Sequence, residues 1–239
     1  MELISALRDF IRDYKLMAIR PRAGKTPLLK GRFDFHAHHS QFGDIDDSFD
    51  LEIDVPIAFP KALPVVTETG NKIPRQQGFH VNPDDTLCLG SPLRLLLLLS
   101  RNPTLTGFAE KCLVPYLFAV SLKLKTGKDL AFGELAHGAP GALDDYVSLF
   151  GLKTHDQALQ VLLLLGKKKR IANKQRCPCG CRLRLGKCSF NRQLAPFRNL
   201  ASRPWYREQH RDMLLMLELA ERRIRNALNV RGSILSPSH

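Results

Sequence analysis

Four cysteines within twelve residues constrain this chain more than any other feature of its sequence. The stretch RCPCGCRLRLGKC holds Cys177, Cys179, Cys181 and Cys188. Four thiols this close in sequence cannot all form unstrained disulfides, whereas thiolates around a tight turn at Gly180 suit tetrahedral zinc. We therefore predict a structural Zn²⁺ site with these four cysteines as its candidate ligands. We do not expect a catalytic zinc, because nothing in the stretch keeps a coordination position open.

The cluster resembles the SEC-C type of zinc knuckle at that motif's first three ligand positions. Cys177-Pro178-Cys179-Gly180 and Cys188 carry this resemblance. The motif's fourth ligand usually follows the last cysteine, and here that residue is Ser189. Cys181 stands where the motif normally has Ser, so the fourth ligand is either Cys181 or a distant histidine.

The N-terminal sequence and the short apolar runs predict a cytoplasmic protein. MELISALRDFIRDYKLMAIR contains acidic residues and lacks a small-residue cleavage site, so we expect no secretory signal. The longest apolar runs, such as Leu95–Leu99 and Val161–Leu165, have five residues each. A membrane-spanning helix needs roughly 20 apolar residues, so none is expected. Clustered cysteines without a secretory signal point to a reducing compartment.

The charge is strongly positive and unevenly distributed. The chain of 239 residues has 36 Lys and Arg against 23 Asp and Glu, a net charge of +13. Residues 34–54 are acid-rich and residues 164–192 are basic, including a Lys-Lys-Lys-Arg run at 167–170 that we interpret as a solvated helix end. The surplus favours acidic partners. Nucleic acid stays open as a partner but is not favoured, because Phe190 alone interleaves the basic stretch.

Periodicity predicts a helix followed by strands in the first third of the chain. Residues 2–18 have apolar residues at helical spacing, and Pro21 and Gly24 end the pattern. Period-two segments at 33–35 and 51–55 and a short Val65-Val66 strand follow. We therefore predict a small antiparallel meander across residues 29–90.

Beyond Gly90 the pattern becomes helical. We expect helices at 92–100, 105–123 (kinked or split at Pro115), 142–150, 155–166 and 206–228. The fold class is α+β: an antiparallel meander with flanking helices, then a helical C-terminal region with a zinc knuckle. The predicted domains are residues 1–126, residues 127–230 with the knuckle at 177–189, and a disordered tail at 231–239.

The surroundings of Cys88 leave two interpretations open. A lone cysteine between Leu87 and Leu89 is commonly a small buried apolar residue of a strand. In an extended segment, however, the two leucines point away from the thiol, and the helix start at Ser91-Pro92 brings positive backbone dipoles that lower a thiol pKa. Asp84 and Asp85, in contrast, would raise the pKa of the thiol.

FPKALPVV, then His80-Val81-Asn82, then Leu87-Cys88-Leu89, resembles the ubiquitin-conjugating enzyme family. The resemblance covers about residues 1–125 and implies a ubiquitin-conjugating-like fold in which Cys88 carries a protein C-terminus as a thioester. It also implies Asn82 as oxyanion donor and His80 as a brace for the loop. Val81 replaces the family's Pro, the gap from Asn82 to Cys88 is shorter than usual, and Gly90 replaces a common Asp.

GELAHGAPGALDDYVSLFG, with the cysteine cluster after it, resembles the C-terminal part of bacterial ubiquitin-conjugating-like proteins from CBASS-type antiphage operons, which signal with cyclic oligonucleotides. That resemblance implies a cGAS-like nucleotidyltransferase as partner, with its C-terminal carboxylate as acyl donor and an amine or other nucleophile as acceptor. The alternatives are a non-catalytic zinc-knuckle adaptor and a basic nucleic-acid-binding protein.

His36 and His38 could lie on one face of a strand as a metal-binding pair. No third ligand is near them in the sequence, so we interpret them as surface histidines.

Overall fold

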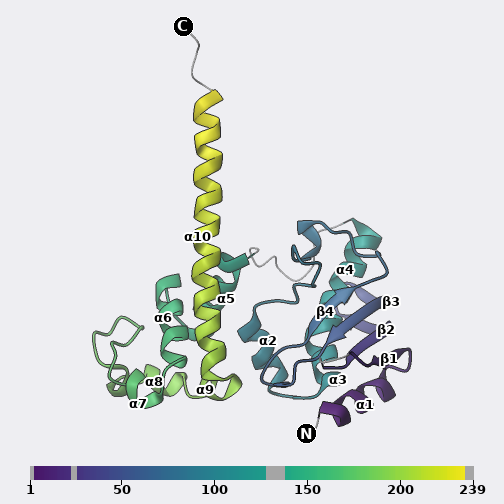
Figure 1. The fold of residues 1–239 in the computed structure, drawn as a ribbon, viewed down its shortest axis with the longest axis horizontal. Coiled ribbons are helices and arrows are strands. Elements are labelled where there is room, and N and C mark those ends of the chain that lie inside the picture. Colours follow the sequence, from purple (N-terminus) through teal and green to yellow (C-terminus); the bar gives the residue numbers. More distant parts are fainter. Residues whose placement is uncertain (1–2, 23–25, 128–137, 235–239) are drawn as a thin grey trace. The chain divides into compact units, whose positions relative to one another are not determined.

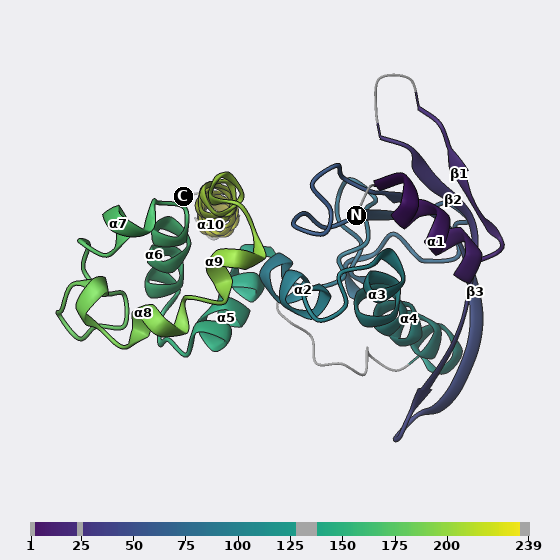
Figure 2. The same ribbon diagram turned by 90° about the horizontal axis from the view of Figure 1, so that it is seen from below.

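The computed structural model describes residues 3–22, 26–127 and 138–234. The chain forms two compact units, residues 1–135 and residues 136–239, and each is described by itself (Figures 1 and 2). The division falls within residues 128–137, which lie outside the described part of the chain, whereas the sequence placed the domain boundary after residue 126. The chain as a whole is α+β.

The first unit begins with helix α1 (Leu3–Asp13) and contains a four-stranded sheet of order β1-β2-β3-β4. All neighbouring strands are antiparallel, which confirms the predicted meander. The strands are β1 (Met17–Arg20), β2 (Leu28–His39), β3 (Gly43–Asp54) and β4 (Val65–Glu68). Because β2 and β3 pair along all twelve residues, they form the long hairpin on which the unit is built.

One face of this sheet is covered and the other is exposed. Side chains alternate along β2 and β3, as strand geometry requires, so Phe33 and Phe49 are buried while Lys30 and Glu52 form an exposed ion pair with 2.6 Å between Nζ and Oε1. Helix α1 and the segment from α3 (Leu105–Phe108) to α4 (Val114–Thr126) lie on the covered face (Figure 2). The core of the unit lies between these helices and the sheet.

The predicted N-terminal helix is too long. Helix α1 ends at Asp13, and Met17–Arg20 forms strand β1 against Leu28–Gly31. Helical spacing pointed to Met17 because it must be buried, but the sheet buries it equally well. Gly31 permits this pairing, since a Cβ there would lie 2.2 Å from the carbonyl oxygen of Leu16.

Helix α2 (Pro92–Leu99) confirms the predicted helix start at Ser91-Pro92. The next predicted helix is interrupted, as expected at Pro115, but the interruption is a π-helical turn, η2 (Ala109–Leu113), between α3 and α4. Proline has no N–H to donate, and the wider turn directly before it absorbs the break in the hydrogen-bond ladder.

The helical stretch Leu105–Thr126 is long and apolar enough to cross a membrane by length and composition alone. Our expectation that the chain contains no such segment considered only uninterrupted apolar runs and therefore missed it. Within the first unit 67% of its most apolar window is buried, and the buried core helix of a water-soluble domain passes the same test. The stretch is therefore weak evidence for a membrane.

The second unit is helical, apart from the cysteine segment. Its elements are α5 (Gly138–Phe150), α6 (His155–Leu165), α7 (Lys169–Ala172), the short turn η3 (Leu185–Lys187), α8 (Phe190–Gln193), α9 (Phe197–Leu200) and α10 (Arg203–Ile234). Helix α10 packs along α5 and α6 through its first turns and continues beyond them (Figure 1). Tyr206 is buried at its base, where its hydroxyl donates to the carbonyl of Phe197.

The predicted disordered tail begins too early. Residues 231–234 belong to α10, which runs to Ile234, whereas the sequence suggested a helix end at Leu228. The helical pattern weakens there because Arg and Gly replace apolar residues, yet the helix continues without a break. Residues 235–239 lie outside the described part of the chain.

We predict that Gly31→Ala destabilises the first unit more than Gly43→Ala does. Both glycines have a positive φ, at 153° and 76°, but nothing lies within 4 Å of a Cβ at Gly43. Backbone strain alone should cost about 1 kcal/mol at Gly43, and the clash with Leu16 should bring the cost at Gly31 to about 3 kcal/mol.

Hydrogen exchange of the β2 and β3 amides measures this difference. Tryptophan fluorescence would not report on the stability of the first unit, because the chain's one Trp, Trp205, belongs to the second unit. Equal losses of protection in the two variants would contradict the close approach at Gly31.

Candidate functional site

Cys88 lies at the end of a tight hairpin formed by residues 80–88. The N–H of Cys88 donates to the carbonyl of His80 at 2.8 Å, Val81 pairs with Leu87 as an antiparallel bridge, and the N–H of Asn82 donates to the carbonyl of Thr86 at 2.8 Å. Asp85 closes the turn with φ 65°. His80 and Asn82 are therefore close to Cys88 through the backbone.

Two contacts attach this hairpin to the open edge of the sheet. The N–H of Leu87 donates to the carbonyl of Val66 at 2.8 Å, and Thr86 bridges Thr67, so the hairpin extends the meander beyond β4. Leu87 is buried, whereas Cys88, on the opposite side of the extended backbone, is partly exposed. Leu89, the other flanking leucine, is only partly buried, as Cys88 is, so the predicted alternation is confirmed for Leu87 and not for Leu89.

The pKa of Cys88 departs in the direction opposite to the lowering effect expected of the helix start at Ser91-Pro92, one of the two opposing effects that the sequence left open. Burial raises the pKa of this thiol, and the backbone N–H of Gly90 opposes the rise without cancelling it. A partly exposed sulfur still loses much of the water that stabilises a thiolate, and this desolvation outweighs the nearby helix start. Cys88 is therefore a neutral thiol at neutral pH.

The side chain of Asn82 is engaged within the hairpin turn. Its Nδ2 donates to Oγ1 of Thr86 at 2.9 Å, and that hydroxyl donates to Oδ1 of Asp84 at 2.6 Å. In this conformation the amide stabilises the turn and makes no hydrogen bond to Cys88. The predicted role of Asn82 as oxyanion donor stays a prediction that requires the amide to turn.

His80 contributes to the hairpin through its backbone, with φ 53° and a carbonyl that accepts from Cys88. The predicted bracing role of its ring stays a prediction.

Sequence reasoning missed Tyr116 and Glu68. The hydroxyl of Tyr116, on α4, donates to the carbonyl of Phe79 at 2.8 Å, and its ring lies near enough to Cys88 for a thiolate to raise the pKa of the phenol beyond the effect of burial. Glu68 is fully buried and accepts from the N–H of Gly70 at 2.8 Å and that of Lys72 at 3.2 Å.

Period-two alternation after buried Val66 places Glu68 on the inner face of β4, and this signal could have found it. Tyr116 carries no such signal, because it belongs to an ordinary apolar helix pattern.

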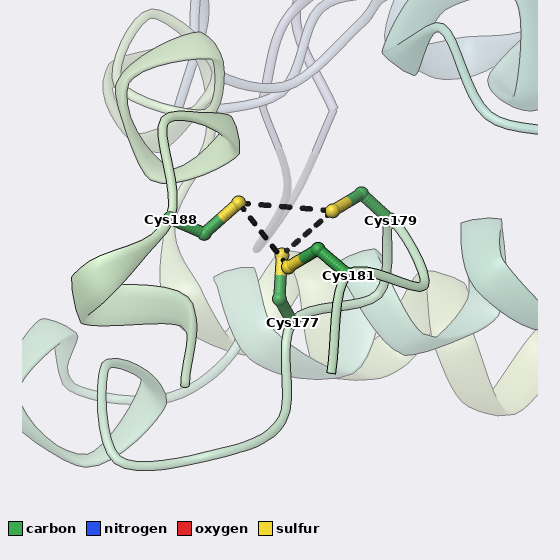
Figure 3. Close-up of side chains that lie close together, drawn as sticks. All are labelled: Cys177, Cys179, Cys181 and Cys188. Atoms are coloured by element: carbon green, nitrogen blue, oxygen red, sulfur yellow. Dashed lines mark hydrogen bonds between the residues drawn. The ribbon is translucent and has the colours of Figure 1, made fainter. Parts of the chain in front are cut away.

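The four clustered cysteines come together as predicted (Figure 3). Their sulfur atoms all lie within 4.8 Å of one another. The Sγ–Sγ distances are 3.3 Å for Cys177 and Cys179, 3.7 Å for Cys179 and Cys188, and 3.5 Å for Cys181 and Cys188. A tetrahedral ion with metal–sulfur bonds of about 2.3 Å requires sulfurs about 3.8 Å apart. The cluster fits a single four-coordinate ion.

A backbone hairpin presents these thiols. The N–H of Cys177 donates to the carbonyl of Leu183 at 2.8 Å, and Gly180 reverses the chain with φ 86°. Cys188 lies just before α8, where the N–H of Phe190 donates to its sulfur at 3.4 Å and lowers the pKa of Cys188 to about 7. Burial, in contrast, raises the pKa of Cys177. Of the four thiols, the one at the start of α8 therefore has a pKa near neutral pH.

Of the two candidates that the sequence left open for a fourth ligand, Cys181 lies with the other three cysteines in the structure. Its sulfur points into the cluster toward Cys188 (Figure 3). Across residues 3–22, 26–127 and 138–234, no histidine joins this group of potential ligands.

His36 and His38 are exposed side chains on β2, as we interpreted them. The Nδ1 atom of His36 lies 2.8 Å from Asp46 Oδ1, and that of His38 lies 2.7 Å from Asp44 Oδ1, across the strand pair. No group of three or more metal-binding side chains in the described part of the chain includes them.

Comparison with protein-family models, curated proteins and solved structures found no significant match to this chain.

We predict that alkylation of Cys88 by iodoacetamide rises with pH along a titration whose midpoint lies above the ordinary thiol value of about 8.5. Burial raises the pKa, so the thiolate that reacts is scarce at neutral pH and accumulates only as the pH exceeds the raised value. Mass spectrometry of the Cys88 peptide measures the rate.

Cys112 is the internal control. It is buried, its pKa is raised to about 11, and it should react more slowly than Cys88 at every pH. A midpoint for Cys88 below 8 would contradict the prediction, because it would show that the helix start lowers the pKa of this thiol more than burial raises it.

Proposed function

We propose that this protein is a cysteine-dependent conjugating enzyme in which Cys88 carries the C-terminus of a partner protein as a thioester. The placement of Cys88 is the observation that carries the proposal. As a residue, Cys88 is only partly buried at the end of a hairpin bonded to the sheet edge, whereas the first unit's other cysteine, Cys112, is buried under α2 with its sulfur 4.0 Å from the carbonyl of Leu95.

The order of elements supports the same proposal. A helix, an antiparallel meander, a loop with the cysteine, and then helices follow one another along the first unit. This is the arrangement that the resemblance to the ubiquitin-conjugating family implies. The finer assignment to a ubiquitin-conjugating-like fold is part of the proposal.

The proposed reaction has two displacement steps at one carbonyl. The Cys88 thiolate attacks an activated C-terminal carbonyl, forms a C–S bond and expels the activating group with its electron pair. An amine or another nucleophile then attacks the thioester carbonyl, the C–S bond breaks, and the thiolate leaves and takes up a proton. No electrons are gained or lost overall.

The raised pKa of Cys88 suits this sequence of steps in two respects. A thiolate derived from a high-pKa thiol is intrinsically more nucleophilic, and it is a poorer leaving group, so its thioester lasts longer before transfer. The small thiolate fraction at neutral pH slows the first attack.

The proposed donor is a cGAS-like nucleotidyltransferase of a CBASS-type antiphage operon, with its C-terminal carboxylate as the acyl group, acting in the cytoplasm. This part rests on the likeness of residues 133–151 and the cysteine cluster to the conjugating-like proteins of such operons. The acceptor is an amine or another nucleophile.

We also propose that the four clustered cysteines hold structural Zn²⁺. All four positions around the ion are taken by sulfur, so the ion's contribution is to cross-link the hairpin to the start of α8.

A non-catalytic zinc-knuckle adaptor is the second candidate. The engagement of the Asn82 amide by Thr86 favours it, because an amide held in the turn does not stabilise an oxyanion at Cys88.

We predict that the purified chain contains about one zinc ion. Cys181→Ser should lose most of it, whereas Ser189→Ala should keep it, because the Cys181 sulfur lies in the cluster. Elemental analysis by mass spectrometry measures both variants. Full zinc content in Cys181→Ser together with loss in Ser189→Ala would place the fourth ligand at Ser189.

We predict that Cys88→Ala abolishes conjugation of the partner nucleotidyltransferase in co-expressing cells, whereas Cys112→Ala keeps it. Immunoblotting of the nucleotidyltransferase for higher-mass conjugates measures the outcome. Cys112→Ala is the matched control because it removes a thiol of the same unit that the sheet and helices bury. Unchanged conjugation by Cys88→Ala would exclude the enzyme and favour the adaptor.

A further inference from the structure

The charge surplus of the chain lies almost entirely in the second unit. Residues 136–239 contain 19 Lys and Arg against 7 Asp and Glu, whereas residues 1–135 contain 17 against 16. The surplus is densest in residues 167–198, called here the basic segment, which have eleven Lys and Arg and no acid. The acids nearest in sequence are Asp156 and Glu208. Zn²⁺ with four thiolates would add a charge of about −2, which leaves a large excess of cations.

Most of these cations are exposed, and the exposed ones are not paired with carboxylates in the part of the chain that the structure describes. Nine of the eleven are exposed, and within the described residues none of the nine forms an ion pair. They are Lys168, Lys169, Arg170, Lys174, Arg176, Arg182, Arg184, Lys187 and Arg192.

The backbone of the hairpin holds like charges together. Arg176 and Arg184 are direct cross-strand neighbours in an antiparallel bridge. The N–H of Gly186 donates to the carbonyl of Asn173 at 3.0 Å, which brings the chain at Lys174 alongside the chain at Lys187. Like charges placed opposite one another destabilise a strand pair. A bound polyanion would remove this repulsion.

We propose that the basic segment binds the phosphate backbone of double-stranded nucleic acid. Among residues 167–198 the aromatic side chains are Phe190 and Phe197, and both are buried. The segment therefore offers no platform on which unpaired bases could stack. Contacts made by Lys and Arg alone attach to phosphates and carry no base sequence information.

A membrane surface fits the segment less well. Peripheral membrane binding uses an amphipathic helix that buries an apolar face, and α7 and α8 have only four residues each. The large apolar side chains exposed in the segment are Ile171 and Leu183, which lie on different elements.

Titration of the full chain into a labelled duplex of mixed sequence, followed by fluorescence anisotropy, tests the proposal. DNA and RNA duplexes of about 20 base pairs are compared at about 50 to 200 mM salt. With about four phosphates contacted, the affinity should fall about 100-fold over that range, since the logarithmic slope is about −0.9 for each contact. Each of the two triple variants described in the next paragraph should make that slope less steep by about two to three, because each removes three cations.

Two variants in the segment share one matched control. Lys168→Gln with Lys169→Gln and Arg170→Gln alters α7 away from the cysteines, and Arg182→Gln with Arg184→Gln and Lys187→Gln alters the hairpin. The control removes three exposed lysines of the first unit, through Lys61→Gln, Lys111→Gln and Lys125→Gln. Both segment variants should weaken binding about 10-fold or more, and the control less than about 2-fold. Zinc content shows whether the hairpin variant has kept its fold, and the α7 variant carries the test if it has not.

Three outcomes would overturn the proposal. The first is no salt-dependent binding of either duplex, and the second is equal weakening of binding by the control variant. The third is that the segment variants lose binding to phosphatidylserine-rich vesicles while their affinity for the duplex is unchanged. The third would make a membrane the ligand. Cys88→Ala should bind the duplex as the wild type does, so failure here is separate from failure of the conjugation proposal.

Discussion

The hydrogen bond from the N–H of Leu87 to the carbonyl of Val66 determines where Cys88 lies. It attaches the hairpin of residues 80–88 to the edge of the sheet, and the pairing buries Leu87. Since neighbouring residues of an extended chain face opposite sides, Cys88 lies opposite the buried Leu87 and is only partly buried. The geometry on which the proposed chemistry rests therefore comes from the backbone, and the side chains of His80 and Asn82 are secondary to it.

The chain uses cysteine in two opposite electrostatic settings. Cys88 lies apart from the other cysteines in the sequence, and the loss of water around its thiol raises the pKa, so the thiol is protonated at neutral pH. Cys188 receives a backbone N–H, which lowers its pKa, and three further sulfurs lie around it. The first setting keeps a thiol protonated, and the second suits thiolates that stay bonded to an ion. In the proposed function, reactive sulfur chemistry belongs to the first unit and structural sulfur chemistry to the second.

Much of the fold could be predicted because it follows from periodicity. The meander, the helix start at Ser91-Pro92, the interruption near Pro115 and the joining of four cysteines each depend on residues close in sequence. Strand β1 could not be predicted, because Met17 is buried equally well in a helix or in a sheet, and its pairing depends on the missing Cβ of Gly31, fourteen residues away.

The details of the candidate site depended on contacts distant in sequence. The raised pKa of Cys88 depends on how far folding removes water from the sulfur, and the nearby helix start alone predicted the opposite direction. The hydrogen bond from Asn82 to Thr86 and the approach of Tyr116 from α4 depend on side-chain conformations that no spacing encodes. The burial of Glu68, in contrast, could have been predicted from the alternation of buried residues along β4.

The intact mass of the wild-type chain, purified from cells that co-express the nucleotidyltransferase, tests the central claim most directly. We expect a covalent adduct that maps to the Cys88 peptide and is released by excess thiol, because a thioester exchanges with thiols. A chain that shows only its unmodified mass, or an adduct that maps elsewhere and resists thiol, would contradict the account.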